Sequence, residues 1–167
     1  MAEISIAERV LDLRGLLNDL TADGLITQDD ANVISGTART RKQLSMHPLA
    51  YIASEQLVDR SRSGKPLDID TLSTWMAEKA KIPLIHIDPL KVKVAAVTDV
   101  MSYAFAKRHG ILCVAVDNDE VTVATTQPFV TGWEPQLEHT ARKSVRRVFA
   151  NPADIDRYMV EFYTLSR

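Results

Sequence analysis

The chain has 167 residues, of which 46% are hydrophobic and 25% are charged, a mixture that excludes an intrinsically disordered protein. Its length suits one ordinary domain or two small subdomains. The 20 lysines and arginines are balanced by 22 aspartates and glutamates, for a net charge of -2. This balance argues against a dedicated nucleic-acid binder, which needs a basic excess to neutralise phosphates.

Two further features concern the compartment. The N-terminal residues lack the basic and apolar regions of a secretory signal, and no window approaches the roughly 18 apolar residues of a membrane span. The single cysteine, Cys113, cannot form an intramolecular disulfide, and its apolar neighbours predict that it is buried. We therefore expect a soluble cytoplasmic protein that reaches a membrane only through a partner.

An apolar stripe predicts the first helix. Residues spaced alternately four and three apart form this stripe: Ile6, Val10, Leu13, Leu17 and Leu20. Gly24 should end the helix in a left-handed conformation. Thr27 then offers a hydroxyl cap for a second helix, which should stop near Gly36.

Two more helices are expected before the pattern changes. Pro48 suits the first turn of one of them. The other is predicted over residues 70–81, with Asp70 as its N-cap. The stretch at 61–66 has the composition of a loop.

The second half mixes strand and helix patterns. In chain order we expect a strand at 84–87, a helix through 100–105 that ends before Gly110, strands at 111–116 and 121–126, a helix at 135–141, a strand at 144–150 and a final helix capped by Asn151. The two central strands must be antiparallel, because so short a connection cannot join parallel strands.

These elements predict an α+β fold. A helical subdomain should occupy residues 1–80, followed by a small α/β subdomain at residues 81–167. The second subdomain should contain a three- to four-stranded, mainly antiparallel sheet flanked by helices.

The sequence does not assemble a catalytic or metal site. A phosphate-binding Walker A loop needs a glycine five residues before its Gly-Lys pair, but Asp59 stands five before Gly64 and Pro66 follows Lys65. The four histidines lack the spacing of metal ligands. We expect no enzyme activity, cofactor or metal; a hidden enzyme would need a cleft that gathers His86, His109 or His139 with a carboxylate.

Three groups of residues are candidates for docking a partner. Leu13, Leu16, Leu17 and Leu20 would present more apolar surface than a small helical part can bury. A basic group, Arg142, Lys143, Arg146 and Arg147, could contact an acidic protein surface or a phosphate, or could simply be a solvated strand face. Trp133 could anchor an interface or cover the edge of a core.

Four stretches resemble, in order and spacing, the N-terminal domain of GspE/PulE-type ATPases of type II secretion and type IV pilus assembly. They are residues 82–90 (IPLIHIDPL), 103–112 (YAFAKRHGIL), 121–128 (VTVATTQP) and 148–155 (VFANPADI). The match spans roughly residues 70–165 and departs at Cys113, where the family usually has proline.

The resemblance implies a regulatory or docking domain rather than the motor itself. Such a domain tethers the ATPase to the inner-membrane platform through the cytoplasmic domain of a bitopic, GspL-like membrane protein. The ATPase domain would lie downstream in the same polypeptide. Neither nucleic acid nor direct membrane insertion is expected.

An alternative within the same family is a domain that senses cyclic di-GMP. Some relatives bind this dinucleotide through an Arg-Leu-Gly-x-x-Leu-x-x-x-Gly-x-Ile motif. Leu20 and the stretch 24–26 match the end of this motif. Gly15 and Leu17 stand where the motif has arginine and glycine, and Arg14 is one place off.

Overall fold

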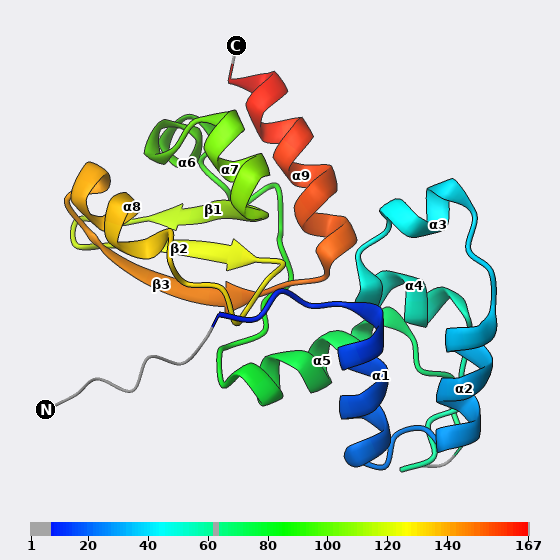
Figure 1. Ribbon diagram of the computed structural model, residues 1–167. Helices are drawn as coiled ribbons and strands as arrows, with labels where there is room; N and C mark the ends of the chain where they lie inside the picture. Colours follow the sequence, from blue (N-terminus) through cyan, green and yellow to red (C-terminus); the bar gives the residue numbers. More distant parts are fainter. Residues whose placement is uncertain (1–7, 62–63, 167) are drawn as a thin grey trace, which may run out of the picture.

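The computed structural model describes residues 8–61 and 64–166, and Figure 1 shows their arrangement. The first half contains α1 (Leu13–Ala22), α2 (Gln28–Gly36), α3 (Arg41–Ser45), α4 (Pro48–Ser54) and α5 (Ile69–Ala80). The second half contains α6 (Val94–Val100), α7 (Tyr103–His109), β1 (Ile111–Val116), β2 (Glu120–Thr125), α8 (Glu134–Ala141), β3 (Ser144–Phe149) and α9 (Pro152–Leu165). Helices α6 to α9 surround the sheet, and α1 to α5 gather below and to the right of it in Figure 1.

The first helix begins later than its apolar stripe predicted. The Asp12 carboxylate accepts a hydrogen bond from the Gly15 amide at 2.6 Å, so Asp12 is the N-cap and α1 starts at Leu13. Val10 lies before the helix and is 65% exposed, which makes its place in the stripe wrong. Ile6 lies outside the described residues.

The local signals around α2 are confirmed, and a similar signal explains a helix that was not predicted. Gly24 has φ 79°, and Thr27 and Asp30 form a reciprocal capping box at the start of α2. Thr40 and Gln43 form the same arrangement at the start of the short helix α3. A Thr-x-x-Gln spacing was therefore the sequence signal for α3.

Helix α5 is capped by a different aspartate from the one predicted. The Thr71 amide donates to the Asp68 carboxylate at 2.8 Å, so Asp68 is the N-cap and α5 begins at Ile69. Asp70 lies in the first turn, where a negative charge favours the helix dipole without capping. The predicted helix start at Pro48 is confirmed by α4.

Two predictions for the second half need correction. Residues 84–87 do not form a strand; Leu84 makes a single parallel bridge to Phe149. The Asp88-Pro89 turn redirects the chain soon after this bridge. The single helix expected through residues 100–105 is two helices, because Met101 is extended and the Ser102 hydroxyl caps α7 through the Phe105 amide at 3.1 Å.

The sheet has the order β1-β2-β3. Strands β1 and β2 pair antiparallel as predicted, with a bulge between Cys113 and Ala115. Strand β3 pairs parallel to β2, since α8 lies in the connection between them and returns the chain to the starting end of the sheet. The α+β fold is confirmed, and its three-stranded sheet is mixed.

The buried apolar residues form two clusters. A helical cluster contains side chains from Leu11 to Ala77 and also Phe149 of β3. A sheet cluster runs from Val97 to Phe162 and includes the buried face of α9. The division near residue 80 stays a prediction, and Phe149 joins the two halves because this strand residue belongs to the helical cluster.

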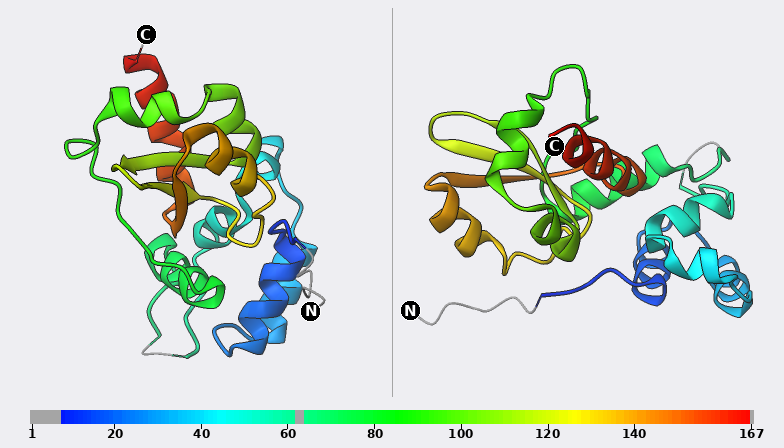
Figure 2. Two further views of the ribbon diagram at one scale, coloured as in Figure 1. Left: turned by 90° about the vertical axis from the view of Figure 1, so that its left-hand side faces the viewer. Right: turned by 90° about the horizontal axis from the view of Figure 1, so that it is seen from above.

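Residues 8–12, here called the N-terminal strap, also join the halves. Figure 2 shows the strap as the extended stretch that leads into α1. The Leu11 amide donates to the Gln127 side chain at 2.8 Å, and the Thr131 amide donates to the Glu8 carboxylate at 2.9 Å. The Arg9 guanidinium lies 4.5 Å from the centre of the Phe129 ring.

Candidate docking surfaces

A groove with a volume of about 550 Å³ lies between α1 and α2. Pockets that hold small molecules usually measure about 300–1,000 Å³. The groove is lined by Leu13, Arg14, Leu17, Asn18, Gln28, Ala31, Asn32, Ser35 and Arg39. Two guanidinium groups and three carboxamides therefore stand over an apolar floor, a set suited to an anion with hydrogen-bonding groups.

Packing holds one of the arginines at the groove. The Arg39 guanidinium lies 5.3 Å from the centre of the buried Tyr51 ring. Burial raises the pKa of Tyr51, so its ring stays neutral and attracts the cation through its π face. On α2, the side-chain amide of Gln28 donates to the side-chain carbonyl oxygen of Asn32 at 3.0 Å.

Sequence reasoning missed this groove, although a signal was present. Arg14 and Asn18 are four residues apart on α1, and Gln28 and Asn32 have the same spacing on α2. Side chains four apart share a helix face. Only the packing of α1 against α2 turns the two polar faces toward one hollow.

The leucines expected to dock a partner are mostly interior. Leu16, Leu17 and Leu20 are at most 2% exposed, so the expected apolar surplus on α1 is wrong for them. Helix α1 contacts both α2 and α4, and these neighbours cover more of its circumference than one stripe. Leu13 is half-buried and lines the groove.

Trp133 is also part of the core. It is 2% exposed and belongs to the sheet cluster. Its indole nitrogen donates to the Val130 carbonyl at 3.0 Å, which satisfies its one polar group. It therefore has no free surface with which to anchor an interface.

Two members of the basic group, Arg147 and Lys143, bind other parts of the described chain, and the other two are exposed. Arg147 pairs with Glu134 and donates to the Pro128 carbonyl at 2.7 Å. Burial raises the pKa of Glu134, and the nearby Arg147 opposes this shift. Lys143 donates to the Asn118 carbonyl at 2.8 Å. Arg142 and Arg146 are exposed and make no ion pair within the described ranges.

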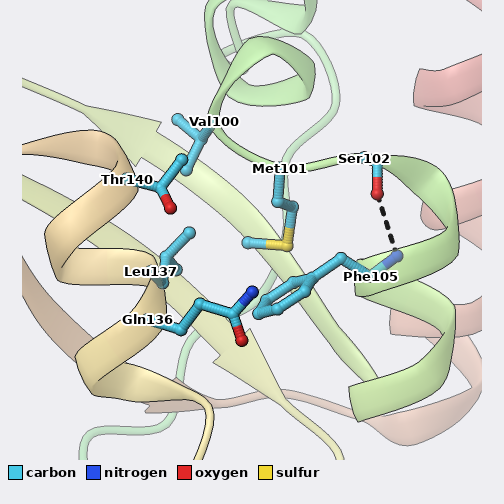
Figure 3. Close-up of a pocket in the computed structure, with 7 residues that line it drawn as sticks. All are labelled: Val100, Met101, Ser102, Phe105, Gln136, Leu137 and Thr140. Carbon is cyan, nitrogen blue, oxygen red and sulfur yellow. Dashed lines mark hydrogen bonds between the residues drawn. The ribbon is translucent and has the colours of Figure 1, made fainter.

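A second hollow, shown in Figure 3, lies between the α6–α7 junction and α8. Met101 and Phe105 face Gln136 and Leu137 across it. Its volume of about 180 Å³ is below the range typical of small-molecule sites.

Groups with reactive potential are dispersed or buried. Among residues 8–61 and 64–166, no three histidine, cysteine or carboxylate side chains come together as a metal would require. Burial raises the pKa of Cys113 to about 12, so its thiol stays protonated and unreactive. No helix within these ranges has the length and apolar character needed to cross a bilayer.

Comparison with known proteins decides the family. The family model of the MshEN domain matches residues 80–167, more than half of the chain. The chain belongs to the MshEN domain family. The resemblance to N-terminal domains of GspE-type ATPases, expected from the sequence, is thereby confirmed.

A curated relative extends the similarity of this MshEN domain to nearly the whole chain. The type IV pilus assembly ATPase TfpB of Acinetobacter baylyi is 42% identical over 158 residues, which cover 94% of this chain. The aligned part is 27% of the relative, so the chain spans about a quarter of that protein's length.

One solved structure shares the fold of this chain. The structure of MshE with cdg, cyclic di-GMP, has a TM-score of 0.57 at 14% identity and covers 92% of this chain and 100% of its own. The N-terminal domain of XpsE has a TM-score of 0.46 at 12% identity and covers 96% of this chain and 98% of its own.

Proposed function

We propose that this MshEN domain is a regulatory and docking module of a type IV pilus or type II secretion ATPase. It would tether the motor to the inner-membrane platform from the cytoplasmic side, through protein contact with a bitopic, GspL-like protein. The observation that carries the proposal is the alignment of 94% of the chain with about a quarter of a pilus assembly ATPase.

Catalysis is assigned to another part of such a protein. In this chain the Gly-Lys pair at Gly64 is followed by Pro66, and Asp59 occupies the place of the first Walker glycine. The stretch that comes nearest to a Walker A motif therefore lacks residues that this phosphate-binding loop needs. The motor domain of the same polypeptide is accordingly proposed as a second partner.

The test of docking is direct binding to platform components. The 167-residue chain would be titrated with the purified cytoplasmic domain of each bitopic platform protein from the same operon. Saturable binding to one of them is expected, and it should weaken when Arg142 and Arg146 are both changed to glutamate. Absence of binding to every platform component would contradict the proposed function.

A second candidate function is the sensing of cyclic di-GMP, favoured by the groove between α1 and α2. Arg14 and Arg39 provide two guanidinium groups, which match phosphate oxygens and guanine edges with paired hydrogen bonds. Leu13 and Leu17 supply an apolar wall.

Calorimetry decides this candidate. Cyclic di-GMP should release saturable heat with the wild-type chain and less with Arg14→Ala or Arg39→Ala, whereas GMP serves as the control ligand. Titration without heat at high ligand concentration would dismiss dinucleotide sensing and leave protein docking standing.

A further inference from the structure

The outer edge of β3 is the starting point, since β3 is the last strand of the sheet. The Ser144 amide donates to the Asp119 carbonyl at 3.0 Å, toward β2. At the other end, Phe149 bonds away from β2: its amide donates to the Pro83 carbonyl at 2.7 Å, and its carbonyl accepts from the Ile85 amide at 2.9 Å.

Strand geometry then gives the direction of the intervening groups. Along a strand of a parallel ladder, successive residues direct their N–H and C=O groups alternately to one side and the other. Val145 and Arg147 therefore direct their backbone groups to the same side as Phe149. The main-chain hydrogen bonds of the described residues give neither of them a partner on that side.

The fourth strand position beside β3 is thus only partly filled. Leu84 bridges Phe149 alone, and the neighbouring stretch leaves after Ile85. Val145 and Arg147 are half-buried, and Ser144 and Arg146 are exposed. An unpaired edge of this kind is a template for one more strand.

We propose that this open edge of β3 accepts an extended acidic segment of a partner protein as an added strand. The proposal rests on the docking function above and names the surface and the chemistry of the partner. Main-chain bonds to Val145 and Arg147 would hold the segment, and carboxylates on it would pair with the exposed Arg142 and Arg146.

The local charges favour an acidic strand. Arg147 is already paired with Glu134, and Lys143 is bonded to Asn118, so Arg142 and Arg146 are the members of the basic group left to bind. The carboxylates of Asp119 and Glu120 belong to the β2 side, where Glu120 is in register with Ser144. They do not occupy the open edge.

A second copy of this chain is a poorer occupant. Pairing two β3 edges would bring the arginines of both copies together, and like charges on neighbouring strands destabilise the pair. A heterologous acidic segment removes this repulsion. The partner is therefore a different protein segment.

The test uses isotope-labelled 167-residue chain and a defined peptide. The probe is a blocked peptide of alternating glutamate and valine, about eight residues long, as in an ordinary strand. Titration should shift and protect the amides of Val145 and Arg147, and a lysine-valine peptide should not. Binding without effect on these two amides, or none at all, would overturn the proposal.

Two matched variants sharpen the result. Val145→Pro removes an outward N–H, which an edge strand tolerates, together with the valine side chain that packs against the sheet cluster. Val145→Thr keeps the N–H and the branched shape. The proline variant should raise the peptide Kd by about fivefold to tenfold, the worth of one main-chain hydrogen bond, and the threonine variant should not. Equal Kd values in the two would overturn the proposal.

Charge reversal keeps the test decisive if the proline variant misfolds. The Arg146→Glu variant should no longer bind the glutamate-valine peptide and should bind the lysine-valine peptide instead. An unchanged preference for the glutamate-valine peptide would contradict strand addition at β3. The same variants then enter the platform titration. Platform binding that is equal for Val145→Pro and Val145→Thr overturns the edge while docking stands, whereas failure of the wild-type chain to bind any platform domain overturns docking itself.

Discussion

The two halves of the molecule differ in how they build their cores. The sheet cluster takes its buried members from residues 97–162 alone, so the second half supplies its own interior. The helical cluster depends on Phe149, which is contributed by β3. The family model likewise matches residues 80–167 and not the helical half. The buried members of the sheet cluster therefore all come from the second half, whereas the helical cluster includes one residue from β3.

Substitution of Phe149 should have the largest effect, and that effect should fall mainly on the helical half. Phe149 is fully buried at 0% exposure, and replacing such a residue by alanine costs about 3–5 kcal/mol. Phe149→Ala should lower the free energy of unfolding by that amount and reduce hydrogen-exchange protection mainly in α1, α4 and α5. Phe162→Ala, in the sheet cluster, is the matched control and should affect α9 and the sheet first. Equal loss in both halves for both variants would refute the asymmetry.

The imidazole ring of His47, which can take up a proton, forms a hydrogen bond between the two halves. Its Nδ1 accepts from the Leu49 amide at 3.1 Å as the cap of α4, and its Nε2 donates to the Thr126 carbonyl at 2.8 Å. These bonds require the neutral ring. Burial lowers the pKa of His47 below its ordinary value of 6.5, and the bond to Thr126 partly opposes this.

The pH dependence follows from that direction. The unfolded chain binds the proton more readily, so the stability from neutral His47 is present above about pH 6.5 and is lost as the pH falls toward the lower folded pKa. His47→Asn keeps a cap acceptor without titrating, and denaturant titrations at several pH values should show a shallower acid decline. The slopes of the free energy of unfolding against pH in the wild type and in His47→Asn cannot differ by more than about 1.4 kcal/mol per pH unit. Burial also lowers the pKa of His109, whose contribution both proteins share. If the free energy of unfolding falls equally steeply with pH in the wild type and in His47→Asn, His47 does not contribute to the pH dependence.

The cap of α5 gives a smaller effect inside the helical half. Asp68→Ala should reduce the free energy of unfolding by about 1 kcal/mol, because the Thr71 amide loses its acceptor. Asp70→Ala, which removes only a first-turn charge, should cost about 0.3–1 kcal/mol at low salt. Thermal denaturation at low and high salt would compare them, and a larger effect of Asp70 would restore the cap predicted from the sequence.

The N-terminal strap should show the smallest effect. Arg9 pairs with Asp19 at 3.2 Å and covers Phe129, yet its side chain is 47% exposed. Arg9→Gln should therefore cost no more than about 1 kcal/mol. Faster hydrogen exchange at the Leu11 and Thr131 amides is the expected readout, since these donors hold the strap to the sheet half. Unchanged exchange would mean that the main-chain bonds hold the strap without Arg9.

Local signals predicted much of the fold and little of the surface. The capping box of Thr27, the glycine turn at Gly24 and the hairpin of β1 and β2 follow from residues near one another in sequence. The strand expected at 84–87 failed because strand formation needs a partner along its length, and here only Leu84 finds one. The groove between α1 and α2 was missed because it belongs to neither helix alone.

By itself, the sequence determined the starts of α2 and α4, the turn at Gly24, the two central strands and membership of the family, because each depends on neighbouring residues or on their order. Only the tertiary structure decided that Leu16, Leu17, Leu20 and Trp133 are interior, and that Val145 and Arg147 stand on an open edge. Burial and strand pairing depend on which distant segment lies alongside, and periodicity cannot specify that neighbour.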